Sequence, residues 1–226
     1  MQNAKQKFNI LSIITAVSFI YLAISPFVMS LFNCIISLIQ GAMFRYVIIS
    51  FFNNFFQNIL CFVASVIAVI CVFTKFDKIG SAVSSLLFWF SGIIALISTI
   101  VNSIRHDYIG STKVILSSIS NLAIYFIIFV VFALFAVFHL MKKPAPDFFK
   151  YLIFIPVALL LIAFIVSFFS NLIEIIKALF MGYPSLYLIN RVVNHLFGLL
   201  GNLMRLLGFS ALLFKVSGFK LKKKTA

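Results

Sequence analysis

Apolar residues dominate this chain in long runs of roughly 20 residues or more, separated by short clusters of Lys, Arg, Gly and Pro. A helical run of that length crosses a hydrocarbon core of ~30 Å, because each residue adds ~1.5 Å. The pattern therefore predicts an all-α, polytopic integral membrane protein: one membrane domain, 1–226, built as a bundle of six transmembrane helices. The expected helices cover about 8–30, 45–74, 81–104, 113–141, 148–180 and 184–217.

The segment 27–44 follows Pro26 and stays apolar, although it contains Asn33, Gln40 and Gly41. Proline can kink or end a helix, so three descriptions fit this segment. It could be a tail of the first helix, a re-entrant segment or an interfacial helix, and the pattern does not separate them.

Composition supports the membrane assignment. Of 226 residues, 64% are hydrophobic and only 10% are charged. A soluble domain needs more polar surface than this, and the six helices leave no room for a separate soluble domain.

The net charge of +14 is best explained by topology. Basic residues lie between the apolar runs, and no basic face with interleaved exposed aromatics can be drawn, so we expect no nucleic-acid partner. Six spans place both termini on one side, and the positive-inside rule makes that side cytoplasmic, because it holds twelve basic residues against five. The twelve are Lys5, Lys7, Lys75, Lys78, Lys142, Lys143, Lys150, Lys215, Lys220, Lys222, Lys223 and Lys224; the five are Arg45, Arg105, Lys113, Lys177 and Arg191.

The basic tail, 218–226, is expected to be cytoplasmic and to contact anionic lipid headgroups. The residues concerned are Lys220, Lys222, Lys223 and Lys224. We expect a bacterial plasma membrane protein. The alternative is the endoplasmic reticulum membrane of a eukaryote, because Lys223-Lys224-Thr225-Ala226 resembles a dilysine retrieval signal.

A narrow polar stripe runs along the last predicted helix. At about 100° per residue, its polar side chains fall on one face of a helix otherwise made of Leu, Val and Phe. The stripe consists of Arg191, His195, Gly198, Asn202 and Arg205. Charged groups are costly in hydrocarbon, so the stripe should face the bundle or a wet cavity.

Glu174 is the natural partner for Arg191, because the two are at similar distances from the turn at Gly182. Antiparallel helices would then place them at the same depth, where they would form an ion pair or share a hydrogen-bond network. In the alternative, Glu174 pairs with Lys177 at i+3 and Arg191 extends outward to the interface.

Other polar residues are expected at this depth, and together they predict an outward-facing pocket. Its proposed substrate-binding residues are Asn54, Asn58, Asn171, Glu174, Arg191 and His195, while Asn202 and Arg205 are assigned to the structural stripe. The alternative for each residue is a hydrogen bond between helices, with an average value of ~0.6 kcal/mol.

Motifs for catalysis or nucleotide binding are missing from the sequence. There is no H-E-x-x-H, G-x-x-x-x-G-K-[ST], G-x-G-x-x-G or G-x-S-x-G, and the three cysteines, Cys34, Cys61 and Cys71, lack C-x-x-C spacing. We therefore expect no catalytic residues, no cofactor and no metal site.

Two functional classes remain. The first is a small solute-binding or transport subunit, which contacts the lipid bilayer and depends on a partner ATPase, another membrane subunit or a gradient. In size and span count alone, this layout resembles the substrate-binding subunits of energy-coupling-factor transporters. The second is a non-catalytic assembly, immunity or structural subunit, whose polar residues only pack helices together.

Overall fold

A computed structural model of the protein describes residues 10–74, 76–106 and 111–218. In these stretches it contains seven helices and no strand, and six helical segments are long and apolar enough to cross a membrane. The expected multi-pass helical membrane fold is confirmed. The helices are α1 (Ile10–Ile39), α2 (Phe44–Val72), α3 (Asp77–His106), α4 (Ser111–Leu140), α5 (Asp147–Leu152), α6 (Phe154–Phe180) and α7 (Ser185–Ser217). The basic tail from Lys220 onward lies outside the described residues.

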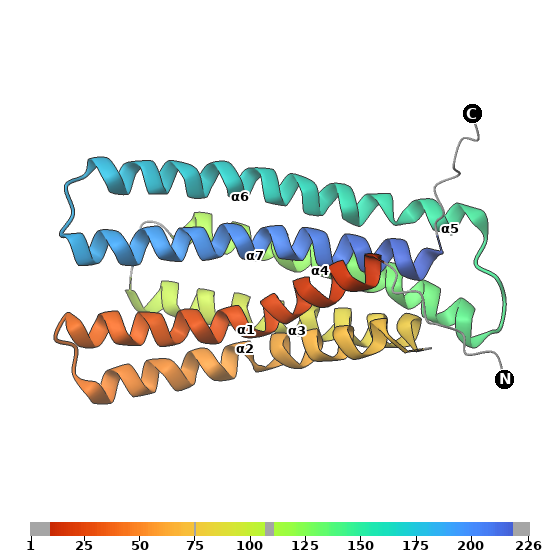
Figure 1. The fold of residues 1–226 in the computed structure, drawn as a ribbon, viewed down its shortest axis with the longest axis horizontal. Coiled ribbons are helices and arrows are strands. Elements are labelled where there is room, and N and C mark those ends of the chain that lie inside the picture. The colour runs from red at the N-terminus through yellow and green to blue at the C-terminus, as the bar shows by residue number, and fades with distance from the viewer. Residues whose placement is uncertain (1–9, 75, 107–110, 219–226) are drawn as a thin grey trace.

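The helices run up and down in a bundle, and α1 packs beside α2, α2 beside α3, α3 beside α4, and α6 beside α7 (Figure 1). The chain returns on itself at α7, which packs against both α6 and α1. The spatial order is therefore α6, α7, α1, α2, α3, α4. Because α6 touches α4 only over a short stretch, the bundle has an open seam between these two helices.

Two tight turns, α1–α2 and α6–α7, lie at the same end of the bundle, on the left in Figure 1. Each turn contains a glycine with positive φ, +84° at Gly41 and +63° at Gly182, where a side chain would be strained. We call this the turn end. The start of α1 and the end of α7 lie toward the opposite side, which we call the termini end.

Residues 27–39 continue α1 and do not form a separate re-entrant or interfacial segment. Pro26 lies inside this helix and has no backbone N–H to donate, yet the helix continues through it to Ile39. The ring of Phe27 packs against Phe55 and Phe62, with ring centroids 5.2 and 5.6 Å apart. The three descriptions left open by the sequence thus reduce to one, a tail of the first helix.

Two other expected boundaries change. Helix α3 begins at Asp77 instead of residue 81, and Gly80, within its first turn, lies buried against Cys71. An added Cβ on Gly80 would lie 1.9 Å from the Cys71 sulfur. The fifth predicted helix is also interrupted at Ile153, three residues before Pro156, whose missing N–H is tolerated in the first turn of a new helix.

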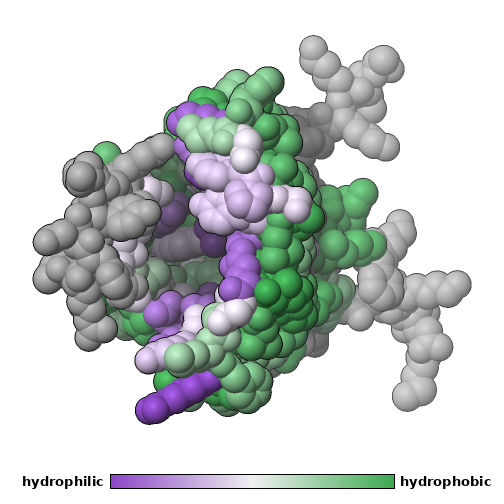
Figure 2. All heavy atoms as spheres, turned by 90° about the vertical axis from the view of Figure 1, so that its left-hand side faces the viewer, coloured by the Kyte–Doolittle hydropathy of each residue, from purple (hydrophilic) through white to green (hydrophobic). Residues whose placement is uncertain are grey.

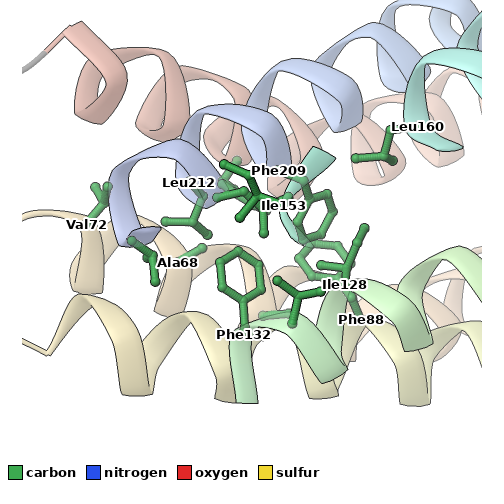
Figure 3. Packing of buried hydrophobic residues seen from close by; sticks show 14 of the residues in the cluster. Ala68, Val72, Phe88, Ile128, Phe132, Ile153, Leu160, Phe209 and Leu212 are labelled. Atoms are coloured by element: carbon green, nitrogen blue, oxygen red, sulfur yellow. The ribbon is translucent and has the colours of Figure 1, made fainter. Parts of the chain in front are cut away.

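The apolar core lies in the termini half of the bundle. Its centre is a three-ring cluster: the centroids of Phe19 and Phe88 both lie 5.1 Å from that of Phe209. Figure 3 shows side chains of the surrounding apolar cluster gathered between the helices. The labelled members are Ala68, Val72, Phe88, Ile128, Phe132, Ile153, Leu160, Phe209 and Leu212.

Candidate functional site

The turn half of the bundle is organised by polar contacts between α6 and α7. Arg191 Nη2 donates to Glu174 Oε2 at 2.7 Å, which confirms the predicted ion pair. Lys177 Nζ also approaches Glu174 Oε1, at 3.2 Å. The two arrangements that the sequence offered as alternatives therefore occur together, with one carboxylate accepting from two cations.

Arg191 has a second set of contacts at the α6–α7 turn. Its Nη1 donates to Tyr183 Oη at 3.2 Å, and its guanidinium carbon lies 5.5 Å from the centre of the same ring. A tyrosine ring and hydroxyl can both stabilise a guanidinium. Arg191 is thus anchored to the turn and to Glu174 at once.

Further along the hairpin, amides and hydroxyls continue the network. Asn171 donates its amide to the Ser167 carbonyl at 2.8 Å, while its Oδ1 lies 2.8 Å from His195 Nδ1. This arrangement requires the proton of the neutral imidazole to be on Nδ1. Asn202 Nδ2 donates to Ser167 Oγ at 2.5 Å, and Arg205 Nη1 donates to Asn202 Oδ1 at 3.3 Å.

The polar stripe of α7 therefore faces α6 and the bundle, as its sequence pattern predicted. Gly198, on the same stripe, leaves room at this interface: an added Cβ would lie 3.7 Å from Asn171 Oδ1. We call the set Ser167, Asn171, Glu174, Arg191, His195, Asn202 and Arg205 the hairpin ladder.

Sequence reasoning missed a second polar contact, which joins α7 to α1. Asn194 and Asn33 donate to each other's Oδ1, at 3.1 and 3.3 Å, and Asn194 also contacts Asn190. An asparagine inside an apolar helix was the available signal, but its partner 161 residues away could not be inferred from spacing.

A groove of about 760 Å³ lies between α4 and α6, with α7 as its floor. That volume is in the usual range of ligand sites, about 300–1,000 Å³. Its polar lining comes from α4, α6 and the hairpin ladder: Ser117, Ser120, Asn121, Tyr125, Ser167, Ser170, Asn171, Asn202 and Arg205. The open seam thus combines a cavity with polar groups.

The bundle is also hollowed at its turn end. Figure 2 looks onto that end and shows hydrophilic side chains bordering the hollow, while the flank beside them is largely hydrophobic. This distribution is the reverse of the termini half, where the interior is apolar.

Arg205 is the notable group in the groove. It is half-buried near the middle of α7, and within the described chain its guanidinium donates to the neutral amide of Asn202. Among the described residues, all three ion pairs involve other cations: Lys150, Lys177 and Arg191. A charge in hydrocarbon costs at least ~2.5–3.5 kcal/mol, so a cation without a carboxylate here favours a polar or anionic occupant.

The six proposed substrate-binding residues are only partly brought together. Asn171 lines the groove; Glu174, Arg191 and His195 lie in the ladder between the groove and the α6–α7 turn. Asn54 and Asn58 are on α2, where the Asn58 amide donates to the Asn54 carbonyl at 2.8 Å, and neither lines the groove. A role in substrate binding stays a prediction for all six.

No group of three or more His, Cys, Asp or Glu side chains that could hold a metal ion occurs within the described stretches. The three cysteines lie apart in α1 and α2 with free thiols. Comparisons of the chain with protein-family models, with curated proteins and with solved structures found no match.

Proposed function

We propose that this multi-pass membrane protein is a small solute-binding or transport subunit, and that the groove between α4 and α6 is its binding site. The observation that carries the proposal is a cation, Arg205, on the floor of a groove of about 760 Å³ without a carboxylate partner in the described chain. Ligand sites are usually cavities in which a few polar groups converge.

In this proposal the orientation of the bundle in the membrane follows from the positive-inside rule. With the termini in the cytoplasm, the turn end faces outward, and the polar part of the groove lies in the outer half of the membrane. The sequence has no nucleotide-binding loop, so a transport cycle would draw its energy from a partner ATPase or from a gradient.

A second candidate is a structural or assembly subunit, and one observation favours it. Most members of the hairpin ladder bond to one another, as expected for polar groups that only hold helices together. The two candidates differ in hydration: a binding groove is wet, and a structural seam is dry.

Cysteine accessibility distinguishes them. In a background with Cys34, Cys61 and Cys71 replaced, Ser120→Cys and Ser170→Cys are placed in phosphatidylcholine nanodiscs and treated with a membrane-impermeant maleimide. Both positions line the groove, so we expect rapid labelling. Nanodiscs expose both faces, which makes the result independent of orientation.

Ile165→Cys is the matched control. Ile165 lies on α6 between the groove residues in sequence, but its side chain is exposed on the lipid side and does not line the groove. A maleimide reacts with the thiolate, which requires water, so this position should label slowly. Labelling of both groove positions as slow as that of Ile165→Cys would contradict the binding proposal and favour the structural one.

A further inference from the structure

We propose that the solute is an anionic amphiphile drawn sideways from the bilayer, with a phosphate or carboxylate headgroup held at Arg205 and its hydrocarbon chain lying in the seam between α4 and α6. This inference rests on the proposed binding function and names its ligand class. Three features of the groove support this inference. The lining changes from polar to apolar along the groove, a charged side chain lies at the boundary between the two parts, and the groove opens to the side of the bundle.

Polarity changes along the groove. The Ser167–Asn202 hydrogen bond sets the level of α6 against α7, and Arg205 then lies one turn closer to the termini end than Asn202. On the turn side of that level, the lining of α4 and α6 is rich in serine and asparagine: Ser117, Ser120, Asn121, Ser167, Ser170 and Asn171. On the termini side it is apolar: Ile127, Leu159, Leu160, Ile162 and Ala163.

Arg205 lies where the two parts meet. Arg205 of α7 and Tyr125 of α4 both line the groove, so the charge borders the cavity. Arginine presents several N–H donors in a planar fork that matches a carboxylate or phosphate. Neighbouring hydroxyls and amides can donate to the remaining headgroup oxygens.

The groove opens to the side of the bundle. Helices α4 and α6 touch only over a short stretch, and apolar members of the groove lining are exposed on the outer surface. Leu116, Ile162 and Val166 have exposed fractions of 64, 58 and 63%. An occupant can therefore keep its chain in contact with hydrocarbon while its headgroup reaches the polar part. A fully hydrophilic solute would leave the apolar part of the groove unmatched.

The test is protection of Ser170→Cys from the maleimide in phosphatidylcholine nanodiscs, with added amphiphiles. We expect dodecyl phosphate to slow labelling by about tenfold or more, and phosphatidylglycerol in the nanodisc to act in the same direction. Dodecylphosphocholine has the same chain without net charge, and inorganic phosphate has the charge without a chain; neither should protect.

Variants of groove residues test whether dodecyl phosphate protects Ser170→Cys by binding in the groove. Arg205→Met should weaken the apparent affinity for dodecyl phosphate by about tenfold or more, since hydrogen bonds to charged groups are the strong ones. Ala163→Trp keeps Arg205 but fills the apolar part, and it should also reduce protection. Ala158→Trp is the matched control on an exposed face of α6 and should protect like the parent.

Each negative result contradicts a different part of the proposal. No labelling of Ser170→Cys in any sample overturns the binding function itself. Labelling without protection by dodecyl phosphate leaves that function standing and overturns the amphiphile inference. Equal protection by inorganic phosphate overturns the requirement for a chain, and equal protection by dodecylphosphocholine overturns the requirement for charge. Undiminished protection in both Arg205→Met and Ala163→Trp overturns the placement in this groove.

Discussion

The two halves of this bundle are held together by different means. In the termini half, rings and small side chains interlock: Phe209 is fully buried between Phe19 and Phe88, and Ser84 donates to the Ala64 carbonyl across α2 and α3 at 2.7 Å. In the turn half, amides and charges bond to one another, and polar side chains line that part of the groove between α4 and α6.

The difference reflects what each contact can do in a bilayer. Lipid is as apolar as a leucine side chain, so apolar helices associate only where close packing gains more dispersion energy than lipid does. That condition is met in the termini half. A polar contact needs fewer neighbouring atoms than apolar packing does, because a single hydrogen bond satisfies both of its groups. Helices joined by such contacts can therefore leave space beside them. The packed half therefore provides rigidity, and the polar half provides space.

The largest loss of stability is expected from a substitution in the packed half that separates α7 from α1. A Cβ on Gly208 would lie 2.9 Å from the Ser18 Cβ, so Gly208→Val forces the helices apart and should cost about 1–3 kcal/mol of unfolding free energy. Unfolding by SDS titration in mixed micelles, followed by circular dichroism, measures this.

Gly201→Val is the control on the same helix, because nothing lies within 4 Å of an added Cβ there. Its unfolding free energy should stay within about 0.5 kcal/mol of the parent. Equal losses for Gly201→Val and Gly208→Val would mean that α7 is not closely packed on α1, and the contrast between the halves would disappear.

In the polar half, the largest effect should come from the ion pair. Glu174 and Arg191 have side chains only about a quarter exposed, 25 and 27%, so Glu174→Gln should cost about 1 kcal/mol. A double-mutant cycle with Arg191→Gln, using the same SDS titration, isolates the pair.

Lys177 offers an internal comparison for this cycle. Its side chain is half exposed, at 51%, and its contact with Glu174 is longer, so the Glu174–Lys177 coupling should be smaller than the Glu174–Arg191 coupling. A larger Glu174–Lys177 coupling would show that Lys177, and not Arg191, is the main partner that stabilises the Glu174 carboxylate.

The smallest expected effect concerns the link between the hairpin and the rest of the bundle. Asn33→Ala removes both amide bonds to Asn194, and a typical interhelical hydrogen bond in a membrane contributes ~0.6 kcal/mol. The cycle with Asn194→Ala should give a coupling of that size. A coupling near zero would leave α1 and α7 joined by apolar packing alone.

Most of the fold follows from the sequence because a bilayer imposes simple demands. A run of apolar residues must be long enough to cross, and its backbone must be helical. The turn at Gly182 and the inward-facing stripe of α7 follow from the same demands. The Glu174–Arg191 pair was one of two arrangements predicted from the sequence, since residues at similar distances from a tight turn lie at similar depth.

The sequence did not reveal which helices are neighbours when they are distant along the chain. Asn33 was visible as an unusual residue, but its pairing with Asn194 depends on α7 packing against α1. The groove depends likewise on α4 and α6 standing apart. The start of α3 was predicted too late, at residue 81, for a related reason: Gly80 lies inside the helix and admits a close approach of Cys71, which only the packed structure shows.

The hairpin ladder has a consequence for biosynthesis. Its ionic and amide contacts, from Glu174 with Arg191 to Ser167 with Asn202, connect α6 only to α7. These two helices follow each other in the sequence and are joined by a short turn, so the groups that bond to one another are synthesised close together in time. The hairpin can enter the lipid with Glu174 and Arg191 already paired, and it can dock on the other helices afterwards.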